Sequence, residues 1–275
     1  MVSEELGIAA DARLLDGLTM IASHAAAAIL TIAPSALARR DKPDRSPVTA
    51  ADEAAQAVIL DGLGQLLPGV PVVSEEAAGQ AEAAALGPRF ILVDPLDGTR
   101  ELLAGRDEFT VNIAIISGGR PVVGVVAAPA RGLLWRGIVS AGAERLALMP
   151  GARPQAATAR SAIHTRARPA SGLVALVSRS HLDPATEAYL ARLKPAERIG
   201  CGSALKFCRI AEGAADLYPR LAPTSEWDVA AGHAVLAAAG GDVTMPDGEP
   251  LCYGQPGFRI PAFIAWGKRD AATAR

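Results

Sequence analysis

The sequence predicts a fold that mixes helices and strands, α+β in the first half of the chain and α/β in the second. Between residues 70 and 139, five apolar runs of strand length follow one another closely, and Gly118-Gly119 provides a turn between two of them. Beyond residue 172, runs of strand length alternate with helical segments, which is typical of an α/β arrangement. The 275 residues are enough for one large domain or two small ones.

Two helices are predicted before the first strand. Residues 5–32 form an Ala-rich apolar segment of the length of a long helix, and residues 41–47 form a charged, proline-containing loop after it. A second helix begins after Thr49, carries Asp52 in its first turn and ends near residue 67.

The five apolar runs are predicted to be strands of one meandering sheet. A buried strand shows as an uninterrupted apolar run, as in Phe90-Ile91-Leu92-Val93. The predicted strands are 70–73, 90–93, 109–117, 121–128 and 132–139.

Residues 150–172 are rich in Ala, Arg, Pro and Thr, lack periodicity and are predicted to connect the two halves. We therefore expect an α+β subdomain at 1–150 and an α/β subdomain at 151–275. Gly240-Gly241 is predicted to end the last helix of the second half. The predicted elements of the second half are helices 184–193, 204–212 and 225–239 and strands 173–177, 215–218, 242–245 and 262–266.

The composition excludes several classes of function. A net charge of −2 argues against broad nucleic-acid binding. Three cysteines, an odd number without a C-x-x-C pair, indicate reduced thiols in a cytoplasmic protein rather than a disulfide framework or a zinc ribbon. The apolar stretch 18–33 contains His24 and is short for a membrane span, so we expect a helix packed against the core and no transmembrane segment.

The hexapeptide Asp94-Pro95-Leu96-Asp97-Gly98-Thr99 is the strongest candidate functional motif. Two carboxylates three residues apart, on a turn at a strand end, can converge on one point. Carboxylates suit hard cations such as Mg²⁺, and the amides of Gly98 and Thr99 can hold an anion. The motif predicts metal-assisted chemistry on a phosphate, although alone it could be a simple tight turn.

Further acidic residues lie at the ends of predicted elements: Asp52, Glu75, Glu76 and Asp228. Asp52 and Asp228 fall in first turns of helices, where they could serve only the helix dipole. Glu75 and Glu76 could be solvated surface charges. Each of these residues alone can be explained by one of these structural roles. Only their combination with the hexapeptide favours one common site.

The ordered motifs resemble the inositol monophosphatase superfamily over nearly the whole chain. The motifs are Thr49-Ala50-Ala51-Asp52, Ser74-Glu75-Glu76, the hexapeptide, and Trp227-Asp228-Val229-Ala230-Ala231-Gly232. The resemblance implies a layered αβαβα sandwich of the sugar-phosphatase type. It also implies a Mg²⁺-dependent, lithium-sensitive phosphatase.

Within the superfamily, the chain is most similar to the 3′(2′),5′-bisphosphate nucleotidases. The stretches that carry this similarity are Arg100-Glu101, 108–114, 178–181, 202–208 and 217–220. Leu102 departs from the pattern, which often has Phe there, but it touches no proposed ligand.

The resemblance implies ligands for two or three Mg²⁺ ions. The first ion would be bound by Glu75, Asp94 and the backbone carbonyl of Leu96, and the second by Asp94, Asp97 and Asp228. A third, weaker ion would lie near Glu75. Mg²⁺ keeps several waters, so a few carboxylates suffice, and two ions about 3.5–4 Å apart can stabilise both the entering and the leaving oxygen.

The resemblance also implies catalytic roles for Asp52, Thr99 and Glu75 around a water activated by the metal. Thr99 would orient this water. Asp52 would accept a hydrogen bond from Thr99 and help to take the proton.

A second phosphate on the substrate has natural partners in Lys206 and Arg220, which lie in otherwise apolar surroundings. Lys206 and Arg220 could instead be ordinary surface charges. His181 could instead have a structural role. The full set of expected substrate contacts is Gly98, Thr99, His181, Ser203, Lys206, Arg220 and Asp228.

The expected activity is hydrolysis of the 3′-phosphate of adenosine 3′,5′-bisphosphate to AMP and phosphate, with 3′-phosphoadenylyl sulfate as a further substrate. This activity would clear a by-product of sulfate activation. Two alternatives stay open: a phosphatase of inositol or sugar phosphates, and a non-catalytic binding protein on the same fold. We expect a small-molecule substrate, no nucleic-acid partner and a cytoplasmic location. Peripheral association with the inner membrane and the oligomeric state stay open.

Overall fold

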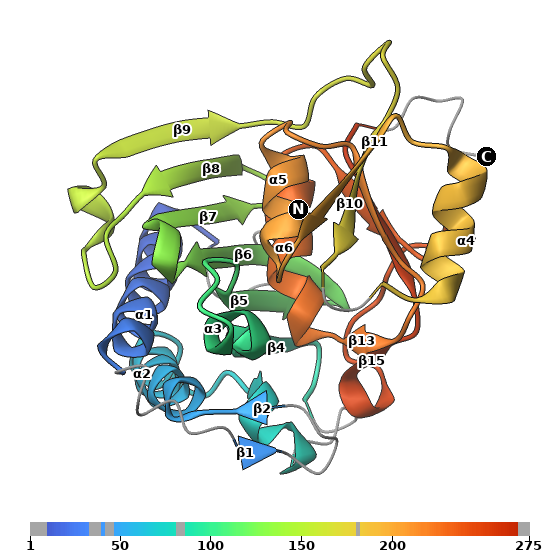
Figure 1. The fold of residues 1–275 in the computed structure, drawn as a ribbon. Helices are drawn as coiled ribbons and strands as arrows, with labels where there is room; N and C mark the ends of the chain where they lie inside the picture. The colour runs from blue at the N-terminus through green and yellow to red at the C-terminus, as the bar shows by residue number, and fades with distance from the viewer. Residues whose placement is uncertain (1–9, 33–39, 42–46, 81–85, 180–181, 269–275) are drawn as a thin grey trace.

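The computed structural model describes residues 10–32, 40–41, 47–80, 86–179 and 182–268. These residues form five alternating layers of helices and sheets (Figure 1). One outer layer holds α1 (Ala12–Thr31) and α2 (Ala50–Leu66), and the other holds α4 (Pro184–Leu193). Two sheets enclose a central layer of α5 (Leu205–Ala211) and α6 (Trp227–Ala238). The predicted αβαβα sandwich is confirmed.

The first sheet has seven strands in the order β3-β4-β5-β6-β7-β8-β9. All neighbours pair antiparallel except β3 and β4, which are parallel. The strands are β3 (Val72–Ser74), β4 (Arg89–Asp97), β5 (Thr110–Ser117), β6 (Arg120–Ala128), β7 (Leu133–Ile138), β8 (Gly142–Ala147) and β9 (Ala159–Ile163).

The second sheet has five strands in the order β11-β10-β12-β16-β14. The pairs of β10 with β11 and with β12 are parallel, as the α/β pattern predicts, and the other pairs are antiparallel. The strands are β10 (Val174–Ser178), β11 (Glu197–Cys201), β12 (Leu217–Arg220), β14 (Asp242–Thr244) and β16 (Phe263–Trp266).

Short elements complete the described residues. Two small antiparallel pairs form from β1 (Arg40–Asp41) with β2 (Pro47–Val48) and from β13 (Thr224–Ser225) with β15 (Arg259–Ile260). A short helix, α3 (Thr99–Leu103), follows β4. Short 3₁₀ segments occupy Glu75–Gln80, Pro129–Arg131, Pro154–Ala156 and Pro256–Phe258.

Helix α1 begins later than the predicted residue 5. Asp11 caps it, because its carboxylate accepts a hydrogen bond from the Leu14 amide at 2.9 Å; residues 5–9 of the predicted helix lie outside the described residues. By length and composition α1 could cross a membrane, but half of its apolar window is buried inside the molecule. Its buried face, with Leu18 and Ile29, packs against α2 and the first sheet, as predicted.

The segment predicted as a connector contains a strand. β9 forms the last edge of the first sheet, and four of its five residues are exposed, so its sequence carries no apolar run. β8 and β11 also lie outside the predicted strands. The first sheet therefore extends to Ile163, and the division of the chain into 1–150 and 151–275 remains a prediction.

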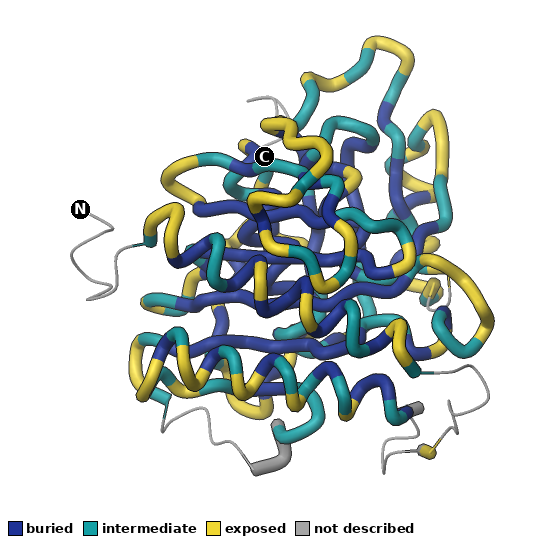
Figure 2. Tube along the Cα trace, turned by 90° about the vertical axis from the view of Figure 1, so that its left-hand side faces the viewer, coloured by how far each residue is buried: buried dark blue, intermediate teal, exposed yellow. Residues whose placement is uncertain are grey.

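Strand alternation separates two cores on the two faces of the first sheet. Buried segments run through the middle of the molecule in Figure 2. Ile91 and Val93 face the core with α1 and α2, whereas Phe90 and Leu92 face the core with α5 and α6. This alternation continues to Asp94 and places its side chain on the α6 face of the sheet.

Candidate active site

The hexapeptide forms the end of β4 and the start of α3, and the prediction of a turn is wrong for its first four residues. β4 continues to Asp97, and its register against β5 shifts between Asp94 and Asp97. Between the pairs Asp94–Asn112 and Asp97–Thr110, β4 advances by three residues and β5 by only two. β4 therefore carries one extra residue, which is a β-bulge. Residues three apart on a regular strand point to opposite faces, and the extra residue lets both carboxylates point toward α6.

Glu75 lies beside Asp94 because β3 and β4 are parallel. Their register pairs Ser74 with Val93, so the next residue of each strand emerges at the same edge. Asp94 is 1% exposed and hydrogen-bonds with Glu75. Burial raises the pKa of Asp94 well above its usual range, and the charges of Glu75, Asp97 and Asp228 raise it further. The four carboxyl groups are therefore close enough to repel one another.

Asp228 brings the second half of the chain into this acidic cluster. It lies in the first turn of α6, and its carboxylate accepts hydrogen bonds from the Thr224 hydroxyl and, at 3.1 Å, from the Ser225 amide. The pKa of Asp97 is raised to about 7, first by burial and then by the charge of Asp228. Lys206 and Arg220 oppose this rise.

Asp52 holds Thr99 from the start of α2. Its Oδ2 accepts hydrogen bonds from the amide of Thr49 at 2.8 Å and from the Thr49 hydroxyl at 2.7 Å, which forms a capping box. Its Oδ1 accepts a hydrogen bond from the Thr99 hydroxyl at 3.0 Å. A hydroxyl that donates its one proton to Asp52 keeps lone pairs that can accept a proton from water.

Gly98 and Ser203 join the hexapeptide to the loop before α5. Gly98 has φ +99°, and a Cβ there would lie 2.4 Å from the Ser203 hydroxyl oxygen, so only glycine fits. The Ser203 hydroxyl lies 2.8 Å from the carbonyl oxygens of both Asp97 and Glu108. The Ser203 hydroxyl thus ties the second half of the chain to the end of β4.

Lys206 is a buried cation close to the acidic cluster. It is 3% exposed, and its Nζ donates to the carbonyl oxygens of Ser203 at 2.6 Å and Cys201 at 3.3 Å. The ammonium lies 4.8 Å from the centroid of the Tyr218 ring. Its charge lowers the pKa of Asp97, which places it within electrostatic reach of the carboxylates.

Arg220 is the second cation at this site. Its Nη2 lies 3.5 Å from the Pro223 carbonyl oxygen, while its buried Nε has no hydrogen-bond partner among the described residues. Burial lowers the pKa of Arg220, but Tyr218, Asp228 and Asp97 outweigh that effect and raise it. His181, which was also predicted to contact the substrate, lies outside the described residues.

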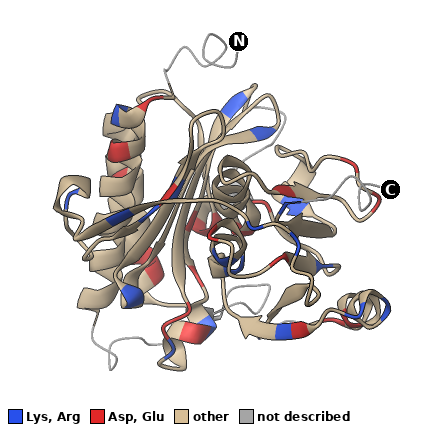
Figure 3. Cartoon of the chain, turned by 90° about the horizontal axis from the view of Figure 1, so that it is seen from above, with Lys and Arg blue, Asp and Glu red and all other residues tan. Residues whose placement is uncertain are grey.

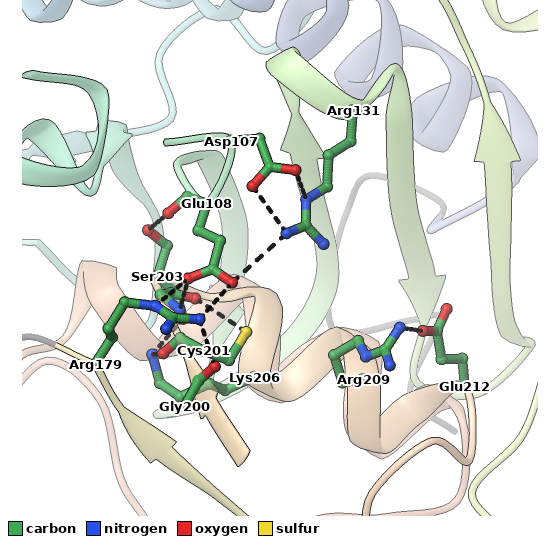
Figure 4. Close-up of polar contacts among 11 residues, drawn as sticks. Asp107, Glu108, Arg131, Arg179, Gly200, Cys201, Ser203, Lys206, Arg209 and Glu212 are labelled. Atoms are coloured by element: carbon green, nitrogen blue, oxygen red, sulfur yellow. Dashed lines mark hydrogen bonds and ion pairs between the residues drawn. The ribbon is translucent and has the colours of Figure 1, made fainter. Parts of the chain in front are cut away.

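An ion-pair network beside Lys206 connects the two sheets (Figure 4). Arg179, after β10, donates to both carboxylate oxygens of Glu108, at 2.9 and 3.0 Å. Glu108 also accepts from the Gly202 amide at 2.9 Å. Burial raises the pKa of Glu108, but the hydrogen bonds from Arg179 and Gly202 outweigh burial and lower it. The network fixes the loop that carries Ser203.

Sequence reasoning did not predict this network. Glu108 and Arg179 both lie in stretches that carried the resemblance, but no role was expected for either. The sequence shows only that two residues of opposite charge lie next to predicted strand ends. That they pair with each other could be predicted only from the way in which the two sheets stack.

The donor set fits Mg²⁺, although no group of three or more Asp, Glu, His or Cys side chains within the described part of the chain forms a ready-made metal cage. Mg²⁺ keeps several of its waters and needs only one or two carboxylates, which are hard oxygen donors. Lys and Arg are interspersed with Asp and Glu over the molecule in Figure 3, so the acidic cluster is a local feature. A cation among these carboxylates would relieve the repulsion that raises the pKa of Asp94.

Comparisons with known proteins agree with this architecture. The family model described as the inositol monophosphatase family matches residues 12–275. A curated relative, the 3′(2′),5′-bisphosphate nucleotidase CysQ of Shigella flexneri, is 42% identical over 266 residues, which cover 91% of this chain and all of that protein.

Two solved structures show the same fold. The crystal structure of CysQ from Bacteroides thetaiotaomicron matches with a TM-score of 0.80 and 37% identity, over 92% of this chain and 97% of that one. An inositol monophosphatase from Anabaena matches with a TM-score of 0.70 and 25% identity, over 95% and 93% of the two chains.

Proposed function

The chain belongs to the inositol monophosphatase family, a family of phosphatases, and from this premise we propose that it is a 3′(2′),5′-bisphosphate nucleotidase. The proposed reaction removes the 3′-phosphate of adenosine 3′,5′-bisphosphate and gives AMP and phosphate. The observation that carries the proposal is the acidic cluster around Asp94 with two cations, Lys206 and Arg220, near enough to lower the pKa of Asp97. The 42% identity to a curated CysQ supports the same substrate.

The acidic cluster is proposed to hold two or three Mg²⁺ ions. Glu75, Asp94 and the carbonyl oxygen of Leu96 are the proposed ligands of one ion, and Asp94, Asp97 and Asp228 those of a second. Bound there, Mg²⁺ supplies positive charge to the phosphate oxygens and acidity to a coordinated water. The low exposure of Asp94 means that its charge is solvated poorly by bulk water and interacts strongly with a cation.

Thr99 and Asp52 are proposed to take the proton of the attacking water. Thr99 donates to Asp52 at 3.0 Å, and the two Thr49 hydrogen bonds hold the Asp52 carboxylate in place. The water oxygen bonds to phosphorus, the bond from phosphorus to the 3′-oxygen breaks, and the 3′-oxygen takes up a proton. No side chain needs to be phosphorylated.

The second phosphate is proposed to bind next to Lys206 and Arg220. The partnerless Nε of Arg220 is a donor available to a phosphate oxygen. The Lys206 ammonium donates to two carbonyl oxygens, and its charge, like that of Arg220, reaches Asp97. His181 and the Ser203 loop complete the proposed substrate contacts, with the amides of Gly98 and Thr99 facing the phosphate that is cleaved.

A phosphate-release panel tests the proposal. The purified protein is assayed with adenosine 3′,5′-bisphosphate, 3′-phosphoadenylyl sulfate, inositol 1-phosphate and AMP, with Mg²⁺ and with EDTA, and with and without Li⁺. We expect Mg²⁺-dependent release that is fastest with the bisphosphate and is inhibited by Li⁺. Faster turnover of inositol 1-phosphate would favour the sugar-phosphatase alternative, and no Mg²⁺-dependent release from any substrate would favour the binding protein.

A further inference from the structure

Asn112 is a buried polar residue that the proposed chemistry has not used. It is the only asparagine in the 275 residues, and it lies in the middle of the first sheet with 1% of its surface exposed. Both its Oδ1 and its Nδ2 are buried and have no hydrogen-bond partner among the described residues. Buried carboxamides are nearly always hydrogen-bonded in folded proteins, so this pair of orphaned atoms calls for an explanation.

Thr110, two residues earlier on β5, shows the same feature. Its side chain is fully buried, and its hydroxyl has no partner among the residues that the structure describes. Most other buried groups near the site are paired, including Asp52 with Thr49 and Ser203 with the Asp97 carbonyl. Three of the five buried side-chain atoms without a hydrogen-bond partner among the described residues therefore lie on this short stretch of β5, and the other two are the Nε atoms of Arg131 and Arg220.

The strand register places these two residues opposite two carboxylates of the acidic cluster. Asp94 pairs with Asn112, and Asp97 pairs with Thr110. Directly paired residues of antiparallel strands point to the same face, with their Cβ atoms about 4.5–5.5 Å apart. Each carboxylate therefore has one buried, partnerless polar side chain as its cross-strand neighbour.

The shared face is the one that meets the start of α6. Ala114 and Ile116, which alternate with Asn112 along β5, belong to the core on the α6 side. Helix α6 packs on β4 and β5 from this side and begins with Asp228 in its first turn. The side chains of Asn112 and Thr110 therefore lie under the acidic cluster rather than on the face covered by α1 and α2.

The chemistry of the pairs is complementary. A carboxylate can only accept hydrogen bonds, whereas a carboxamide and a hydroxyl can both donate. Carboxylates that bind a metal are commonly held by such donors behind them. In this structure neither side chain hydrogen-bonds to its carboxylate neighbour. We propose that Asn112 and Thr110 are positioning residues that donate to the carboxylates of Asp94 and Asp97 when Mg²⁺ is bound and hold them in the orientation that binds the ion. This proposal rests on the Mg²⁺ site of the proposed function.

Substitution with apolar residues of similar size separates this role from a structural one. Asn112→Leu and Thr110→Val remove the hydrogen-bonding groups while they keep most of the volume. Replacing a partnerless buried polar group with an apolar one does not lower the stability of the cation-free protein. We therefore expect the melting temperature in EDTA to stay the same or to rise.

The direct measurement is Mg²⁺ affinity by isothermal titration calorimetry on the full chain, without substrate. We expect the Kd for Mg²⁺ to increase about 10- to 100-fold in Asn112→Leu and about tenfold in Thr110→Val, which is the usual effect of losing such supporting groups. Thr244→Val, a buried threonine of β14 in the other sheet, is the matched control and should keep the wild-type Kd.

The outcomes separate this inference from the proposed function. Wild-type Mg²⁺ affinity in both variants would overturn the inference, as would a loss of melting temperature in EDTA as large as that in Mg²⁺. If the wild-type protein binds Mg²⁺ but releases no phosphate from the panel, the proposed reaction fails and the affinity comparison still decides the role of Asn112. If the wild-type protein binds no Mg²⁺, both proposals are wrong.

Discussion

Single side chains in this site serve the fold and the proposed chemistry together. The Asp52 carboxylate caps α2 through one oxygen and holds Thr99 through the other. Gly98 supplies the left-handed backbone that starts α3, and its missing side chain makes room for Ser203. A substitution at either position therefore changes local stability and the geometry of the hexapeptide at once.

Gly98→Ala tests how tightly the hexapeptide is packed. Its φ of +99° is unfavourable for alanine, and the new methyl group would meet the Ser203 hydroxyl and the Glu108 carbonyl. We expect a loss of about 2–4 kcal/mol in the free energy of unfolding, from backbone strain and overpacking together, and loss of most Mg²⁺-dependent turnover. Urea denaturation and the phosphate-release assay measure the two effects.

Gly105→Ala is the matched control for this substitution. Gly105 also has a positive φ, +67°, but a Cβ added there would have no atom within 4 Å beyond its chain neighbours. The free energy of unfolding of this variant should fall only by the contribution of backbone strain, about 1–2 kcal/mol. Its turnover should not change. Equal losses of stability in the two variants would contradict the close packing of Gly98 against Ser203.

His233 predicts a pH dependence of stability. Burial, with a smaller contribution from Arg120, lowers the pKa of His233 to about 3, and its Nδ1 lies 3.0 Å from the Tyr253 hydroxyl. Below pH about 6.5 the unfolded state binds a proton that the folded state does not. This contribution to stability is therefore complete above that pH and is lost as the pH falls toward 3.

The comparison of wild type with His233→Gln isolates this effect. Between pH 6.5 and 4 the wild-type free energy of unfolding should fall more steeply than that of the variant, by up to about 1.4 kcal/mol per pH unit. Urea denaturation at several pH values measures the two slopes. Parallel curves would show that His233 does not resist protonation in the folded state.

At the scale of elements, the pattern of apolar residues decided which helices and strands could be predicted from the sequence. Helix α4 has the predicted bounds 184–193, and α6 differs by two residues or fewer at each end. β9 was missed because an edge strand with four exposed residues needs no apolar run. The bulge in β4 was also missed, because a Pro-Leu-Asp-Gly sequence is typical of turns, and only pairing with β5 shows that the strand continues.

The contact between Glu108 and Arg179 joins the two sheets and predicts a measurable coupling. The pair is bidentate, and Glu108 is also held by the Gly202 amide. In a double-mutant cycle with Glu108→Gln and Arg179→Gln, we expect a coupling energy of about 1 kcal/mol. Because the pair fixes the Ser203 loop beside Lys206, Glu108→Gln should raise KM for the bisphosphate more than it lowers kcat.

A second ion pair serves as the control for this cycle. Arg198 and Glu187 are joined by one contact of 2.6 Å, and both side chains are at least one-third exposed. Such exposed pairs contribute about 0.2–1 kcal/mol, so we expect a coupling energy at the low end of that range and no change in KM. A KM effect of the same size in both cycles would indicate a general charge effect and not a role of the loop.

At the scale of the whole molecule, the fold assembles the candidate site, which is the acidic cluster and Asp52, from distant segments. Asp52 comes from the start of α2, Glu75 from the 3₁₀ segment directly after β3, Asp94 and Asp97 from β4, and Asp228 from the start of α6. The ordered motifs predicted that these residues belong together, but the sequence could not show how. The parallel β3–β4 pair and the bulge bring the first-sheet acids to one face, and α6, packed between the sheets, adds the last.

Because the ligands come from separate segments, Mg²⁺ should stabilise the molecule as a whole. A ligand at 100 times its Kd contributes about 2.7 kcal/mol to folding, and for a chain of this size about 1 kcal/mol corresponds to 2–4 °C. We expect the melting temperature to rise by roughly 5–10 °C between EDTA and saturating Mg²⁺.

Asp94→Asn should lose this increase and should melt in EDTA no lower than wild type, since it removes a charge that repels its neighbours. Asp61→Asn, an exposed acid on α2, should keep the full increase. An increase that survives in Asp94→Asn would place the bound Mg²⁺ away from the acidic cluster.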